Sequence, residues 1–184
     1  MQTIRSLIRG VAAGAVGTLA MDTLLYRRYH RAGGQSGFLA WESSEGVESW
    51  EHAPAPALVA KRLLESLVKR EVAPRYARLL NNVTHWGFGL AAGAGYGFVV
   101  GSREPKVWSG LPFGAAVWAT GYVVLPRLGV YEEIWKYDLE TLAKDLSAHL
   151  AFGTVTAAAF RLLTDVEDAN QCRNRHSHQT RRSL

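Results

Sequence analysis

The sequence predicts an all-α integral membrane protein, a four-helix bundle with one long polar loop that contains an amphipathic helix. Hydrophobic residues make up 48% of the 184-residue chain, and the charged residues (20%) lie in blocks between nearly uncharged stretches. Two of these stretches match the ~20 apolar residues that cross a bilayer core. The chain also has 18 glycines, which destabilise water-exposed helices but favour close helix packing in lipid.

Residues 8–27 form the first predicted span. Residues 10–26 read GVAAGAVGTLAMDTLLY and carry a single charge, Asp22. Because Arg5 and Arg9 precede this apolar run, a cleaved signal peptide is an alternative. The run is rich in Ala and Gly rather than Leu and contains Asp22, which favours a retained span.

The second and third predicted spans cover residues 83–101 and 107–126, and neither contains a formal charge. They also lack the polar stripe that a soluble helix normally keeps, so we expect them to be the strongest spans. The fourth span, residues 144–163, is weaker, like the first, and Arg161 near its end can reach the membrane surface. A soluble bundle of buried helices is the alternative.

The loop of residues 28–82 separates the first two spans. It contains the acidic, aromatic stretch WESSEGVESWE at residues 41–51, and then Pro54 and Pro56 introduce an amphipathic helix over residues 57–72. This helix is expected to lie at the membrane surface with its Lys and Arg toward headgroups, or to pack on the end of the bundle. Residues 165–184 form a polar, basic tail that we expect to be disordered.

Glycines spaced by four residues recur in the predicted spans. This spacing places them on one helix face, where the missing side chains let two backbones approach closely. Gly110 and Gly114 are one such pair. The glycines expected at helix contacts are Gly10, Gly14, Gly89, Gly93, Gly97, Gly114 and Gly153.

The second and fourth spans share a sequence pattern. Residues 81–89 read NxxxHxxFG and residues 145–153 read DxxxHxxFG. The spacing puts the polar residue, the His and the Gly on one helix face, and the match is consistent with a duplicated helical hairpin. In an up-down bundle, one end then collects a cluster of polar side chains. These are Asp22, His85, Tyr122, Asp145 and His149.

This polar cluster is the candidate site. An ionisable group that faces lipid costs several kcal/mol, so these side chains should face inward and pair with one another. An Asp beside a His can exchange a proton or respond to an ion. His85 and His149 could instead hold a haem or a metal ion, although we expect no cofactor. A structural cluster that fixes helix register is the remaining alternative.

The order of these features resembles the YagU-like family of small bacterial inner-membrane proteins, whose molecular function is unknown. The resemblance rests on GVAAGAVGTLAMD in the first span, Pro74-Arg75 before the His-led second span, PFGAAVW and a late Pro126 in the third span, and HLAFG in the fourth. It implies a multi-pass inner-membrane protein with a link to acid tolerance.

Composition excludes several other functions. The single Cys172 excludes a disulfide framework and a Cys-based zinc site. The formal charge of +5 comes from Lys and Arg in every polar segment, without a nucleic-acid-binding motif, so we expect no nucleic-acid partner. No GxSxG, HExxH or P-loop is present, which favours a protein without enzymatic activity.

The resulting prediction is a non-enzymatic membrane protein with a proton- or ion-responsive polar site. Its partners are membrane lipids, with a second copy of the chain or another membrane protein also open. One alternative is a bis-His cofactor protein, which an absorption spectrum would identify by the colour of bound haem. The other is a membrane scaffold that docks a partner through residues 28–82.

Overall fold

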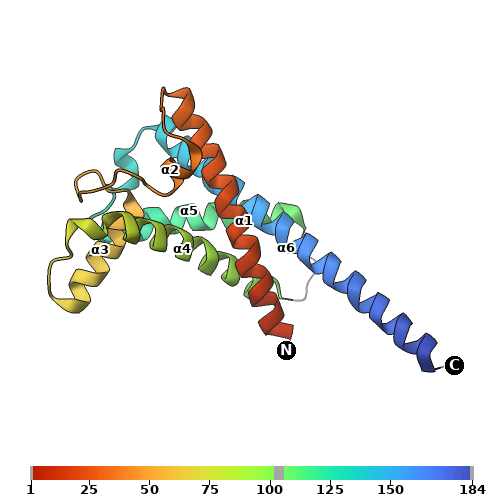
Figure 1. The fold of residues 1–184 in the computed structure, drawn as a ribbon. Coiled ribbons are helices and arrows are strands. Elements are labelled where there is room, and N and C mark those ends of the chain that lie inside the picture. Colours follow the sequence, from red (N-terminus) through yellow and green to blue (C-terminus); the bar gives the residue numbers. More distant parts are fainter. Residues whose placement is uncertain (1, 102–105, 183–184) are drawn as a thin grey trace.

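All regular secondary structure in the described part of the chain is helical, as the sequence predicts (Figure 1). The structure is a computed structural model that describes residues 2–101 and 106–182, with backbone only for 170–172 and 174–182. The α-helices are α1 (Gln2–Arg31), α2 (Phe38–Glu42), α3 (Ala55–Val68), α4 (Ala77–Val100), α5 (Gly110–Arg127) and α6 (Leu139–Arg182). Short 3-10 turns are η1 (Pro74–Tyr76), η2 (Val107–Ser109) and η3 (Ile134–Lys136).

The long helices pack in the order α4, α1, α6, α5. Helix α1 packs against both α4 and α6, whereas α5 packs against α6 and α3 packs against α4. Both chain termini lie toward one end of the molecule, and α2 and α3 lie toward the opposite end, with α6 extending well beyond the other helices (Figure 1). The elements from the 28–82 loop therefore cover the end where the polar cluster is expected.

Glycine positions bring the paired helices into backbone contact. A Cβ atom added to Gly93 would overlap the backbone of Gly10 and Gly14, which fixes how closely α1 approaches α4. In the same way, a Cβ added to Gly153 of α6 would overlap Gly110 and Gly114 of α5. All the glycines that the sequence places at helix contacts lie in such contacts, and Gly17 forms a further one with α6.

Two of the described helices are long and apolar enough to cross a membrane: α1, and α6 over Leu139–Ala169. The expectation that α4 and α5 are the strongest spans is therefore wrong when helices are judged by their length and mean hydropathy. These two helices are free of charge over long stretches, but they contain many Gly, Trp, Tyr and His residues, which contribute little hydropathy. Helices of this length and composition also occur in the cores of soluble proteins.

The C-terminal segment differs from the expected disordered tail. Helix α6 continues to Arg182, because no Gly or Pro occurs between residues 154 and 182 to end it. Its residue Glu167 also forms ion pairs with two side chains of α1, at 3.3 Å from Arg5 and 2.6 Å from Arg9. The helix is therefore anchored to the bundle beyond the expected fourth span.

The amphipathic helix of the loop is present as α3, shifted from the predicted residues 57–72. It begins at Ala55, because Pro56 fits the first turn of a helix, where its missing N–H is not needed. It ends at Val68, because Lys69 adopts a left-handed conformation with φ 55°. The structure thus confirms a helix in the loop and moves its boundaries.

Candidate functional site

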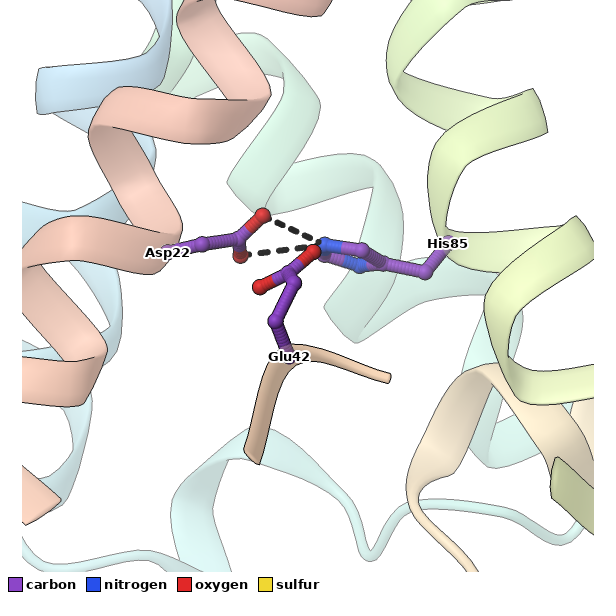
Figure 2. A group of neighbouring side chains, drawn as sticks. All are labelled: Asp22, Glu42 and His85. Carbon is purple, nitrogen blue, oxygen red and sulfur yellow. Dashed lines mark hydrogen bonds and ion pairs between the residues drawn. The ribbon is translucent and has the colours of Figure 1, made fainter. Parts of the chain in front are cut away.

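Asp22 is the most deeply buried ionisable group of the predicted cluster. It is 2% exposed and lies on the same face of α1 as Gly14 and Thr18, which contact α4. Because the glycine contacts hold the two helices close, Asp22 reaches His85 of α4. Nε2 of His85 lies 3.0 Å from Oδ1 and 3.1 Å from Oδ2 of Asp22 (Figure 2).

Glu42, at the end of α2, completes this group. One donor atom from each of Asp22, Glu42 and His85 lies within 4.8 Å of the others, and their side chains converge from three separate elements (Figure 2). Nε1 of Trp86 donates a hydrogen bond of 3.0 Å to Oε1 of Glu42 and so fixes its carboxylate. We call these three residues the acidic triad.

The segment after α2 is held on α4 by several hydrogen bonds. Arg78 and Asn82 both donate to the carbonyl oxygen of Ser43, at 3.0 and 2.9 Å. Asn81 donates to the hydroxyl of Ser44 at 2.7 Å. These contacts position Glu42.

The sequence alone does not identify Glu42 as a site residue. Glu42 lies 43 residues from His85, in a loop without a helical periodicity that could link the two residues.

The acidic triad carries more negative than positive charge. It has two carboxylates and one imidazole, and among the described residues no Lys or Arg forms an ion pair with Asp22 or Glu42. Burial raises the pKa of Glu42 above its ordinary value, and the negative charge of Asp22 raises it further. Both effects favour the protonated, neutral form of Glu42, whereas the neighbouring His85 acts in the opposite direction.

The other predicted cluster residues form a second group around α6. Nδ1 of His149 lies 3.4 Å from Oδ1 of Asp145 and 2.9 Å from its carbonyl oxygen. The buried Tyr122 hydroxyl also interacts with Asp145. Tyr131 and Tyr137 pack on Tyr122, each with 5.5 Å between ring centroids. Burial raises the pKa of Tyr131 to about 12, and Asp145 adds to this effect.

A pocket of about 540 Å³ connects the two groups, since both His85 and His149 line it. One nitrogen of each ring is already engaged, Nε2 of His85 with Asp22 and Nδ1 of His149 with Asp145. The five residues of the predicted cluster thus divide into an Asp22–His85 pair and a group of Tyr122, Asp145 and His149. A cofactor held by both histidines stays a prediction.

Comparisons of the sequence and structure with protein-family models, curated proteins and solved structures found no match. The class of protein that the fold and site define is a helical protein with two candidate membrane-spanning helices and a buried Asp–His pair. The resemblance to the YagU-like family stays a prediction.

Proposed function

We propose that this chain is an integral membrane protein of four spanning helices that binds a divalent metal ion at the acidic triad. The observation that carries the proposal is the imbalance of charge at this site. Asp22 is almost fully buried and lies close to a second carboxylate, and a buried charge needs compensation by a partner or a metal. A bound cation would supply the missing positive charge.

The donor atoms indicate which ions fit. One imidazole nitrogen with two carboxylates suits Mn²⁺, Fe²⁺ or Zn²⁺ better than Ca²⁺, which prefers a larger set of oxygen ligands. Metal–ligand bonds of ~2.1 Å place opposite donor atoms at most about 4.2 Å apart. The observed limit of 4.8 Å therefore requires only a small rotation of Glu42, and the hydrogen bond from Trp86 is the kind of outer contact that orients a ligand.

The distribution of side-chain sizes supports a membrane location. Most buried residues are small, with four aromatic side chains (Tyr96, Tyr122, Phe152 and Phe160) among them, whereas many large apolar side chains lie on the outside. A soluble monomer rarely exposes so much contiguous apolar surface, but lipid tails would cover it. Examples on three of the four long helices are Ile4, Ile8, Leu19, Val83, Phe98, Val99, Leu111 and Val123, each at least 43% exposed.

The role that fits this geometry is ion-responsive rather than catalytic. The three ligands come from α1, α2 and α4, so a bound ion would tie the loop that carries α2 to the helical bundle. Loss of the ion would leave two facing carboxylates and loosen this attachment. Ion binding would thereby control the position of the loop at that end of the bundle.

Thermal unfolding in detergent tests the proposed metal site. After chelator treatment, addition of Mn²⁺ or Zn²⁺ should raise the Tm of the wild-type protein more than Ca²⁺ does, because only the former match the donor set. Glu42→Gln should remove most of this increase. Glu48→Gln is the matched control, because Glu48 is an exposed acidic residue of the same loop. An equal increase in Glu42→Gln and wild type would contradict the site.

Membrane integration is tested separately by fractionation. The protein should stay in the membrane pellet after washing with alkaline carbonate and with high salt, because spanning helices are not displaced by conditions that release surface-bound proteins. Release into the carbonate supernatant would contradict the four-span proposal and leave the metal site untouched.

A further inference from the structure

Helices α4 and α5 stay apart at the end of the bundle that α3 covers. At the other end, Tyr96 and Phe113 fill the space between the helices, with ring centroids 5.0 Å apart. By contrast, α1 and α6 approach closely, since a Cβ added to Gly17 would overlap the side chain of Thr156. A pocket lies between α4 and α5 at the end that α3 covers, and residues of α1 and α6 also line it.

The walls of this pocket are mostly apolar, apart from a few polar side chains that include His85 and His149. Its apolar lining includes Phe88 of α4, Val124 of α5, and Val59 and Leu63 of α3. Several of these side chains also reach the outer surface, with Phe88 55%, Val124 43% and Leu63 48% exposed. The pocket is therefore partly open to the outside of the bundle, and lipid could reach it there if the bundle lies in a membrane. Its volume of about 540 Å³ lies in the usual range for small-molecule sites.

A positive charge lies at the rim of the pocket. Nη2 of Arg62, on α3, lies 3.8 Å from the position of a Cβ built on Gly129. The neighbouring Leu128 and Tyr131 line the pocket. Arg62 is exposed, and no carboxylate in the described part of the chain forms an ion pair with it. An apolar pocket with an unpaired guanidinium at its rim matches an amphiphile with an acyl chain and an anionic head.

We propose that this pocket binds an acyl chain of an anionic membrane phospholipid, whose phosphate lies against Arg62. The lipid is the occupant that a membrane-embedded chain meets at high concentration, and α3 with its basic side chains would lie at the headgroup level. This proposal rests on the membrane location proposed above and does not require the metal ion, although His85 lies at both sites. It gives α3 a role as the element that joins the lipid headgroup to the pocket.

A glycine inside the pocket allows a direct test. Gly121 lines the pocket, and a Cβ added there meets its nearest atom, Cδ1 of Leu125, at 3.9 Å, so Gly121→Phe would fill the pocket without a backbone clash. Gly95→Phe is the matched control, since a Cβ added to Gly95 meets nothing within 4 Å and Gly95 does not line the pocket. Both variants add the same ring to a membrane helix.

Native mass spectrometry of delipidated protein, titrated with phosphatidylglycerol or phosphatidylcholine of equal chain length, should show one retained phosphatidylglycerol per wild-type chain. We expect Gly121→Phe to reduce retention at least tenfold and Gly95→Phe to leave it unchanged. Arg62→Gln should abolish the preference for the anionic lipid, because only the headgroup contact is lost.

Equal retention in Gly121→Phe and wild type, or no preference for the anionic lipid in wild type, would overturn the proposal. So would purification with a free fatty acid or a coloured cofactor in the pocket. A protein that resists carbonate but shows no lipid preference would overturn only the pocket assignment. Release by carbonate would overturn the membrane location on which the pocket assignment rests.

Discussion

Asp22→Asn is expected to abolish the stabilisation by metal ions while leaving the ion-free protein about as stable as wild type. Asn has nearly the same shape as Asp and can still form a hydrogen bond with His85, but it carries no charge. In the ion-free protein the substitution removes the unfavourable proximity of Asp22 to the carboxylate of Glu42. At an ion concentration of 100 times Kd, the wild-type protein should gain about 2.7 kcal/mol and the variant almost nothing.

Asp145→Asn is the matched control for this experiment. Asp145 also pairs with a His, His149 of the same helix, but it is not part of the acidic triad. Its substitution should leave the metal-dependent gain in unfolding free energy unchanged. If Asp22 only fixed helix register, Asp22→Asn would destabilise the protein equally with and without metal, and chemical unfolding at several Mn²⁺ concentrations would show this.

Gly93→Leu is expected to have the largest effect on folding. Gly93 faces the backbone of Gly10 and Gly14 on α1, and even a Cβ atom has no room there. The two helices would have to separate, at a cost on the order of 3 kcal/mol, the upper end for overpacked cores. Because the same contact brings Asp22 to His85, the variant should also lose its response to metal.

Gly95→Leu provides the comparison, since Gly95 lies two residues further along α4 and points into open space. The same side chain at this position should change the Tm by a small amount only. Thermal unfolding of both variants in detergent measures the difference. Equal Tm values for the two variants would show that the close approach of α1 and α4 contributes little to stability.

The parts of this structure that the sequence predicts are those governed by helix periodicity. Glycines at a spacing of four, such as Gly10 and Gly14, must share a helix face, and they lie at the α1–α4 contact. That Asp22 and His85 lie at the same end of the bundle also follows from periodicity and from the antiparallel order of the helices, whereas the sequence does not specify which Asp pairs with which His. In both cases the helical repeat of the local sequence determines which residues share a face or an end of the bundle.

Other features depend on the tertiary fold and leave no periodic signal. Glu42 reaches the site because hydrogen bonds between the loop and α4 hold α2 in place. The pocket is lined by residues of helices that are distant in sequence, such as Phe88 and Val124. The sequence also does not predict the helical continuation beyond residue 165. Its polar composition favours disorder, and the ion pairs of Glu167 with α1 that hold it are long-range contacts, which the local sequence does not reveal.

Pulsed electron paramagnetic resonance of Mn²⁺ bound to the purified protein is the most direct test of the metal site, because it detects the ligand nitrogen itself. We expect one tightly bound Mn²⁺ per chain, with a nuclear coupling from a single imidazole nitrogen. This coupling should disappear in His85→Gln and persist in His149→Gln. Absence of bound Mn²⁺ in the wild-type protein, or a nitrogen coupling that survives in His85→Gln, would contradict a metal site at Asp22, Glu42 and His85.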